Sequence, residues 1–268
     1  MLKDITLGQY FPGNTVVHRL DPRTKLLLVI IYMVALFTAK WFVSYGLVLI
    51  FLLTAAWISR VRPSAMLKGL KPLLIIILLT GFLNIFYTTG GTLLVEWKFI
   101  HIYSKGLETA FFMIARIVML IAGTFLLTYT TSPIALTDGL ELLLSPLKKI
   151  KLPVHELSMM MCIALRFIPT LIEETDKIIS AQKARGADFE SGNLLRRAKA
   201  LIPILVPLFI SAFRRADELA VAMECRCYHG GEGRTRMKQL RFAPRDGVAL
   251  ALGALLVAAV IVLRNLGL

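Results

Sequence analysis

Residues 26–58 read LLLVIIYMVALFTAKWFVSYGLVLIFLLTAAWI and contain a single charged residue, Lys40. A bilayer core is about 30 Å thick and takes about 20 helical residues to cross. As one helix, this stretch would be about 50 Å long, which is too long for one crossing. We therefore predict two membrane helices joined by a tight turn at residues 38–41. The first helix would have only about 14 residues before that turn, so a re-entrant element is the alternative.

The composition of the whole chain agrees with a membrane protein. Of its 268 residues, 57% are hydrophobic and 18% are charged, and the formal net charge is +14. A soluble domain is about 45–50% apolar and about 25% charged. These values exclude a soluble enzyme and a soluble nucleic-acid binder, so we expect no nucleic-acid partner. Three cysteines are too few for a disulfide framework. No signal peptide is expected, because the first 25 residues lack a short apolar core.

Three further apolar stretches predict further membrane helices, at residues 72–88, 106–131 and 248–263. The expected fold class is therefore an all-α polytopic membrane protein with about five transmembrane helices that cross or enter the lipid bilayer. The loop at residues 89–105 contains a Gly90-Gly91 turn and a β-prone run from Leu93 to Tyr103, which predicts a small hairpin.

The distribution of positive charge predicts the orientation. Cytoplasmic segments collect Lys and Arg, and 26 of the 31 such residues fall on one side of this layout. We therefore expect a cytoplasmic N-terminus. The expected domains are a membrane domain at residues 1–131, a cytoplasmic domain of long amphipathic helices at 132–246, and a last transmembrane helix at 247–268.

The cytoplasmic domain is expected to contain three helices, at about residues 133–147, 153–185 and 194–228. Ser132-Pro133 has the pattern of an N-cap followed by proline at the first helical position. The apolar pieces Leu157–Leu165 and Leu201–Ala212 are short and flanked by charges. We interpret them as helices packed on each other beneath the membrane, with membrane insertion as the alternative.

A weak repeat relates the last two of these helices. A shift of 41 residues superimposes Asp176 on Asp217, Ala181 on Ala222 and Arg185 on Arg226. Each arginine ends an apolar stripe with a spacing of seven residues, which is nearly two helical turns. The stripes are Leu171, Ile178 and Arg185 in the first copy, and Ala212, Leu219 and Arg226 in the second.

These two arginines have a simple and a functional interpretation. A cation at a helix C-terminus is favoured by the helix dipole by about 0.3–1 kcal/mol. The repetition favours a docking role instead. Small neighbours, Ala184 and Gly186 in one copy and Cys225 and Cys227 in the other, leave each guanidinium free for bidentate hydrogen bonds to a partner.

These residues resemble the transmembrane T component of energy-coupling factor (ECF) vitamin transporters over nearly the whole chain. The stretches Gly8–Gly13 and His18–Lys25 are similar to the start of that family, and Arg166–Pro169 is similar to its turn before the second coupling helix. Ala181–Gly186 resembles its first Ala-Arg-Gly motif. Residues 222–228 occupy the place of the second motif, with Cys-Arg-Cys instead of Ala-Arg-Gly.

The resemblance implies a non-catalytic scaffold that links two cytoplasmic ATPase subunits to a small substrate-binding S component in the bacterial cell membrane. Each arginine motif would end a coupling helix that docks in a groove of one ATPase. ATP-driven closure would move these helices and reorient the S component, which releases its vitamin inside. The implied docking residues are Ala184, Arg185, Gly186, Cys225, Arg226 and Cys227.

The remaining motifs do not predict chemistry in this chain. No G-x-x-x-x-G-K-[ST] phosphate loop occurs in the sequence, so we expect no catalysis and no cofactor. The C-x-C-x-H pattern at residues 225–229 suits zinc but lacks a fourth ligand, so no metal site is expected. The alternatives that stay open are a stand-alone membrane enzyme or secondary transporter, and a dedicated cobalt- or nickel-uptake member of the same family.

Two further features concern the membrane. Arg116 lies about ten residues into a predicted span, where ionisable groups usually face protein. A structural contact and a functional role both stay open for it. The glycine-rich stretch Gly230–Arg236 is expected to be a hinge leading back to the membrane. The nearby cations are expected to face anionic headgroups; they are Arg234, Arg236, Lys238 and Arg241.

Overall fold

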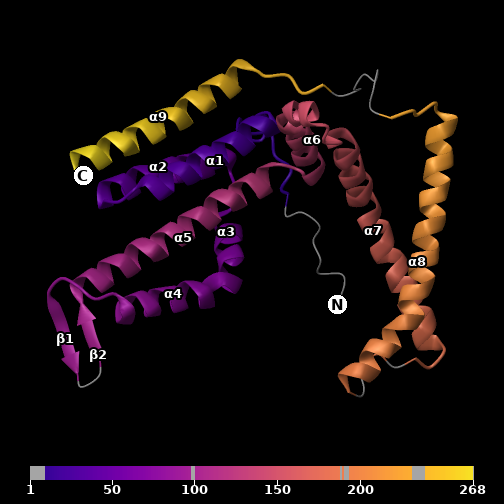
Figure 1. Cartoon of the computed structure of the whole chain (residues 1–268), viewed down its shortest axis with the longest axis horizontal. Helices are drawn as coiled ribbons and strands as arrows, with labels where there is room; N and C mark the ends of the chain where they lie inside the picture. Colours follow the sequence, from indigo (N-terminus) through magenta and orange to yellow (C-terminus); the bar gives the residue numbers. More distant parts are fainter. Residues whose placement is uncertain (1–9, 98–99, 188, 190–192, 231–238, 268) are drawn as a thin grey trace. The chain divides into compact units, whose positions relative to one another are not determined.

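The computed structural model of the chain describes residues 10–97, 100–187, 189, 193–230 and 239–267. Its elements are almost all helical (Figure 1). In chain order they are α1 (Pro22–Thr38), α2 (Phe42–Ser59), α3 (Pro63–Leu70), the 3-10 turn η2 (Lys71–Leu73), α4 (Leu74–Tyr87), β1 (Leu93–Trp97), β2 (Ile100–Tyr103), α5 (Ser104–Thr130), α6 (Pro133–Leu144), the 3-10 segment η3 (Ser145–Ile150), α7 (Val154–Ala184), α8 (Leu194–Cys225) and α9 (Pro244–Leu266).

The chain divides into two compact units. Gly8–Leu140 and Leu240–Leu268 form the first, which we call the bundle unit. Glu141–Gln239 forms most of the second, which we call the crossed-helix unit. The last helix, α9, therefore packs with the N-terminal helices, although about 100 residues of the other unit separate them in the sequence.

In the bundle unit, α1, α2, α5 and α9 lie side by side, and α4 lies along α5 (Figure 1). Their core is apolar, with Leu36, Val48 and Val260 fully buried. Tyr32 is also buried, and its hydroxyl donates a 2.9 Å hydrogen bond to the Met119 carbonyl. This bond satisfies the polar end of the ring inside an apolar core.

A glycine allows α5 to approach α1 closely. A Cβ at Gly123 would lie 2.5 Å from the ring of Tyr32, which is closer than any real contact. The same holds on α9, where a Cβ at Gly253 would lie 2.8 Å from the side chain of Leu28. Small residues at helix interfaces are what membrane helices use to pack closely.

The predicted turn at residues 38–41 is confirmed, because α1 ends at Thr38 and α2 begins at Phe42. Helix α1 begins earlier than expected, at Pro22 instead of Leu26. The Asp21 side chain accepts a hydrogen bond from the backbone N–H of Arg23, and proline is suited to the first helical position. At 17 residues, α1 is about 26 Å long.

The predicted hairpin is also confirmed. Strands β1 and β2 pair antiparallel, with Leu93 opposite Tyr103 and Trp97 opposite Ile100. The basic segment after α2 contains a helix, α3, that was not predicted. It begins at Pro63, which suits the first position of a helix. The third predicted span corresponds to α4, which follows α3 after one 3-10 turn.

Five helices in the described part of the chain are long and apolar enough to cross a membrane, so the all-α polytopic class is confirmed. Four of them contain predicted spans, namely α2, the continuous α3–α4 stretch, α5 and α9. The fifth helix that is long and apolar enough is α7. The sequence predicted that this helix lies outside the bilayer. The remaining predicted span, α1, is shorter than the roughly 30 Å of a bilayer core.

The crossed-helix unit is built on α7 and α8, which pack against each other. The predicted helix up to residue 147 is shorter in the structure, since α6 ends at Leu144. Pro146 lies just beyond, and the residue before a proline is disfavoured in an α-helix. A 3.0 Å hydrogen bond between the Glu141 carboxylate and Nδ1 of His155 connects the end of α6 to the start of α7. Most of the apolar side chains of α7 and α8 are not buried within the unit.

Candidate functional site

Arg185 occupies the C-cap of α7, directly after its last helical residue. Its φ and ψ are −86° and 5°, and the following Gly186 has φ +87°. The N–H of Gly186 donates to the Lys183 carbonyl, and the N–H of Ala187 donates to the Gln182 carbonyl, both at 3.0 Å. This pair of bonds is a Schellman motif, which satisfies the last carbonyls of a helix.

Arg226 occupies the same position at the end of α8. Its φ and ψ are −95° and 18°. The N–H of Cys227 donates to the Glu224 carbonyl at 2.8 Å, and the N–H of Tyr228 donates to the Met223 carbonyl at 3.0 Å. Cys227 itself has φ +57°, in the left-handed region that glycine occupies in the first copy. The Cys-Arg-Cys sequence therefore keeps the backbone geometry of the Ala-Arg-Gly sequence.

Both arginine side chains lie at the surface of the crossed-helix unit. Arg185 and Arg226 are exposed, as are their neighbours Ala184, Gly186, Cys225 and Cys227. Within the described part of the chain, neither arginine side chain makes a hydrogen bond or an ion pair. The predicted apolar stripes behind them, Leu171, Ile178, Ala212 and Leu219, are half-buried.

The two helices cross at an ion pair between equivalent positions. The guanidinium of Arg215 donates to the carboxylate of Glu174 at 2.5 Å, and these residues are separated by the repeat length of 41. Further along α7, the Gln182 amide donates to the Pro203 carbonyl of α8 at 3.4 Å. Helices α7 and α8 are therefore antiparallel.

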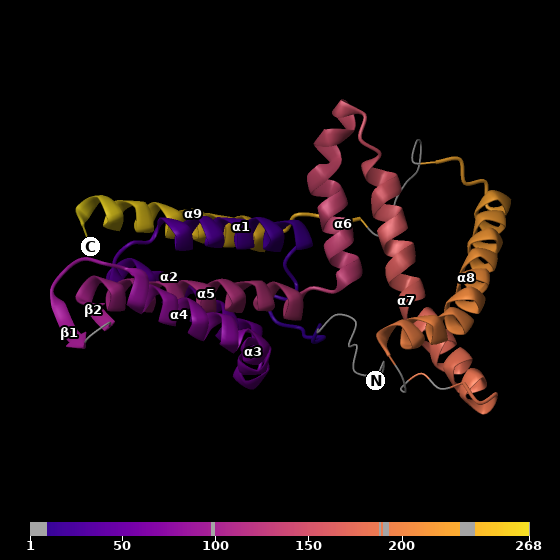
Figure 2. The same ribbon diagram turned by 60° about the horizontal axis from the view of Figure 1, so that its bottom comes forward.

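This antiparallel crossing places the last turns of α7 and α8 at opposite ends of the helix pair (Figure 2). The two arginines directly follow those turns. Arg185 and Arg226 each lie 11 residues beyond the crossing residue of their own helix. At 1.5 Å per residue, each is about 16 Å from the crossing along its helix. The repeat that was weak in the sequence is thus an approximate two-fold relation in the structure.

The C-x-C-x-H pattern begins at the last residue of α8. Cys225 and Cys227 are free and exposed. Among the residues that the structure describes, no group of three or more His, Cys, Asp or Glu side chains could hold a metal ion. Most of the glycine-rich hinge that follows, residues 231–238, lies outside the described residues.

Comparison with known proteins identifies the family. Residues 13–237 match the CbiQ family, described as a cobalt transport protein. The chain is 57% identical over 265 residues to the energy-coupling factor transporter transmembrane protein EcfT of Clostridium kluyveri, covering 98% of both chains. It is also 51% identical over 246 residues to EcfT of Bacillus subtilis, covering 92% of this chain and 93% of that one. The chain belongs to the EcfT family. The resemblance stated from the sequence is thereby confirmed, and the chain is a membrane component of an ECF transporter.

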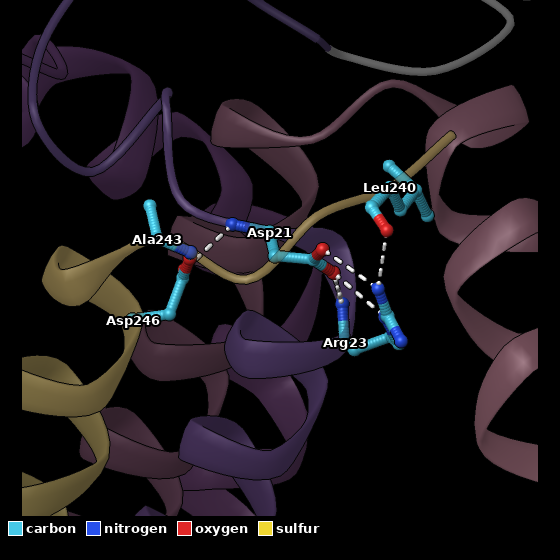
Figure 3. Close-up of polar contacts among 5 residues, drawn as sticks. All are labelled: Asp21, Arg23, Leu240, Ala243 and Asp246. Carbon is cyan, nitrogen blue, oxygen red and sulfur yellow. Dashed lines mark hydrogen bonds and ion pairs between the residues drawn. The ribbon is translucent and has the colours of Figure 1, made fainter. Parts of the chain in front are cut away.

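A second polar cluster in this EcfT-family chain escaped the sequence analysis. It joins the start of α1 to the start of α9 and consists of Asp21, Arg23 and Asp246, with the backbone of Leu240 and Ala243 (Figure 3). We call it the polar latch. Asp246 is buried, and its two carboxylate oxygens accept from the backbone N–H groups of Asp21 at 2.9 Å and Ala243 at 2.8 Å.

Arg23 completes the latch. Its guanidinium pairs with both Asp21 carboxylate oxygens at 3.2 Å and donates to the Leu240 carbonyl at 2.9 Å. The same group lies 4.3 Å from the centre of the Phe242 ring, which adds a cation–π contact. The segment that leads into α9 is therefore fixed to the start of α1 by two charged side chains, the Arg23 guanidinium from α1 and the Asp246 carboxylate from α9.

The Arg116 side chain on α5 hydrogen-bonds one residue in the α1–α2 turn and one residue in the first turn of α2. It donates to the Tyr45 hydroxyl at 2.9 Å and to the Ala39 carbonyl at 3.3 Å. The Ala39 residue is fully buried. The structural interpretation of this arginine is therefore supported, since its guanidinium satisfies backbone at a turn inside the bundle.

Proposed function

We propose that this EcfT-family chain is a non-catalytic scaffold and transducer of an ECF-type ABC importer for vitamin uptake. It would link two cytoplasmic ATPase subunits to a substrate-binding S component in the cell membrane. The observation that carries this proposal is the pair of exposed arginines, Arg185 and Arg226. They share one backbone motif, and they lie at opposite ends of a helix pair at equal distances from its crossing.

Two such ends suit two equivalent partners. A Schellman motif holds each arginine on a rigid helix end. Its side chain can therefore enter a groove without any loop of this chain having to become ordered. A guanidinium can make bidentate hydrogen bonds to carboxylates or several bonds to carbonyls of an ATPase groove. Each ATPase would bind one of the two motifs, Ala184–Gly186 or Cys225–Cys227.

The crossed helices α7 and α8 would transmit the motion of the ATPase subunits. When ATP binding closes the ATPase pair, the two grooves approach each other, and the helix ends must move with them. Helices α7 and α8 touch around the Glu174–Arg215 pair and bury few apolar side chains between them. A change of crossing angle therefore disrupts little packing, which is what a two-state element biased by its partners requires.

Apolar side chains on the crossed helices supply a surface for the membrane companion. Large apolar residues rarely form extended exposed patches unless they meet a partner or lipid. Methionines in such a surface can adapt to several partners. The exposed side chains include Leu157, Met160 and Met161 on α7, and Leu201, Leu205, Phe209 and Phe213 on α8. We assign this surface to the S component and the adjoining bilayer surface, with the N-terminus of the chain in the cytoplasm.

The test removes the two arginines. Arg185→Ala and Arg226→Ala should each weaken ATPase association by about 2–5 kcal/mol, because each leaves an interface charge unpaired. The double variant should lose ATP-driven uptake while still inserting in the membrane. Matched controls on the same helices are Lys177→Ala and Arg214→Ala, both exposed and outside the motifs. Unchanged ATPase co-purification and uptake in the double variant would refute the proposal.

A second candidate is metal uptake, because the matching family is described as a cobalt transport protein. The arginine docking would be the same, and only the companion and its cargo would differ. Co-purification from the native membrane followed by mass spectrometry distinguishes the two. A small companion that binds a vitamin supports the first candidate, whereas uptake of labelled Co²⁺ or Ni²⁺ by the purified complex supports the second.

A further inference from the structure

An apolar groove runs along the bundle unit between α1, α2, α5 and α9. Its volume is about 770 Å³. Its walls are almost entirely hydrocarbon, and several lining side chains are more than half exposed, among them Ile50 and Leu252. The other walls include Leu28, Phe51 and Leu127. Well-packed helices leave no such space, so something apolar is expected to fill this groove in the membrane.

The groove has the length of one membrane leaflet. Its wall on α2 extends from Leu47 to Ile58, and its wall on α9 extends from Pro244 to Ala259. These spans correspond to about 17 Å and about 23 Å of helix. One leaflet of a bilayer core is about 15 Å deep. A single fatty acyl chain is therefore the right length for the groove.

A polar pocket adjoins one end of the groove. It has a volume of about 850 Å³ and shares Val16 and Ile58 with the groove. Residues 11–18 form one side, and the segment after α2 forms the other, with the exposed side chains of Arg60 and Arg62. Arg60 has φ +53°, a conformation that favours glycine, yet it is a long cation.

The charges at this end are all positive among the described residues that line the two spaces. Arg245 lines the groove there, and neither the groove nor the pocket includes a lining Asp or Glu in the described chain. Lys25 also lines the groove, but its ammonium already donates to the His18 and Thr130 carbonyls and lies near the buried carboxylates of Asp21 and Asp246. His18, also in the pocket, donates from Nε2 to the Phe11 carbonyl at 3.1 Å, and its Nδ1 is hydrogen-bonded to the Thr15 hydroxyl at 2.7 Å. Burial lowers the pKa of His18 and nearby Lys25 lowers it further, whereas its bond to Phe11 opposes them.

We propose that groove and pocket together bind one anionic glycerophospholipid. Its phosphate group lies in the pocket beside Arg60 and Arg62, and one acyl chain fills the groove. The positive side chains of the pocket complement the phosphate, and the length of the groove matches the depth of one leaflet. It is independent of the arginine docking, because it concerns only the bundle unit.

The experiment uses the full chain assembled with its partner subunits in phosphatidylcholine vesicles. A phosphatidylglycerol that carries a photoreactive group on its acyl chain is added as the probe, and the labelled peptides are identified by mass spectrometry. Labels should fall on the walls of the groove on α2 and α9. Arg60→Gln and Arg62→Gln should each lower labelling about fivefold, and the double variant about thirtyfold.

Matched variants on one helix test the acyl site. Ala249 lines the groove, whereas Ala251 is exposed on the same helix outside it. Ala249→Phe should remove groove labelling, and Ala251→Phe should leave it unchanged. Thermal unfolding and partner co-purification show that each variant is folded.

Three outcomes would overturn the proposal. The first is equal labelling of the two phenylalanine variants. The second is equal labelling by a phosphatidylcholine probe with the same photoreactive chain, which would remove the role of the arginines. The third is labelling in the isolated chain that disappears in the complete transporter, because a partner helix would then occupy the groove.

Discussion

Glu174 on α7 and Arg215 on α8 form an ion pair at 2.5 Å, and each lies 11 residues before the arginine that ends its helix. Equivalent positions of a repeat meet each other only at the axis that relates the two copies. The pair therefore marks the axis of the crossed helices. On each helix, the arm from this axis to the terminal arginine has the same length.

Reversing charge at this crossing tests its role. Glu174→Arg or Arg215→Glu alone places like charges in contact and should reduce ATP-driven uptake. The double exchange should restore it. Both side chains are about one-third exposed, so solvent screens the pair and the stability effect should be about 1 kcal/mol or less. A double-mutant cycle on uptake rates and unfolding temperature measures the coupling, and failure of the double exchange to recover uptake contradicts the role.

Cys227→Gly should stabilise the end of α8. Cys227 has φ +57°, where a Cβ costs about 1 kcal/mol and glycine has no such cost. The expected result is slower hydrogen exchange in the last turn of α8, with ATPase docking retained. Cys227→Ala is the control, because alanine keeps the Cβ and therefore keeps its conformational cost. Equal exchange rates in the glycine and alanine variants would show that backbone strain is absent there.

Gly186→Ala is the converse change at the end of α7. Nothing lies within 4 Å of the position that a Cβ would take, so the effect is purely conformational. With φ +87° at this position, alanine should destabilise the cap by about 1 kcal/mol or more. Faster hydrogen exchange at Arg185 and Ala187 would report it. An unchanged exchange rate would mean that the cap relaxes to another conformation.

Arg116→Leu should destabilise the α1–α2 turn. Arg116 lies about 21 Å along α5 from Thr130, so the turn that it contacts lies within the depth of a bilayer core. Loss of the guanidinium leaves the buried Ala39 carbonyl without that donor, at a cost of about 1–3 kcal/mol. Tyr45→Phe removes only one bond and should cost about 0.5–1.5 kcal/mol. Thermal unfolding in detergent gives both values, and the reverse order would contradict this assignment.

Asp246→Asn should loosen the polar latch. Both carboxylate oxygens accept from backbone N–H groups, and an amide nitrogen would face one of those donors. The expected loss is about 1–3 kcal/mol in the free energy of unfolding. Arg264→Gln, exposed at the other end of α9, is the control and should change nothing. If the two variants unfold alike, the latch contributes no stability.

Local patterns predicted most of the elements. The single charge at Lys40 between two apolar runs was enough to predict the turn after Thr38, since a helix through it would be too long for a bilayer. Proline and glycine signals predicted the starts and ends of α7 and α8 to within three residues. Helix α3 was missed because its eight residues are too short for a periodic pattern, and only Pro63 indicated its start.

The contacts between distant residues could not be predicted. Asp21 and Asp246 are 225 positions apart, and neither local sequence indicates a contact with the other residue. An acidic residue in the first turn of α9 indicates a cap, but not that the same carboxylate also binds the start of α1. The pairing of Glu174 with Arg215 was hidden in the 41-residue repeat, which related the two positions without indicating that they touch.

The two ends of the crossed pair also differ in chemistry, because free thiols flank Arg226 and none flanks Arg185. The third cysteine of the chain, Cys162, is only partly accessible. A maleimide reagent would therefore reach the end of α8 and spare the end of α7 in the unaltered sequence. A short thiol-to-amine crosslinker started from Cys225 or Cys227 would then test whether an ATPase subunit docks at that end, as proposed.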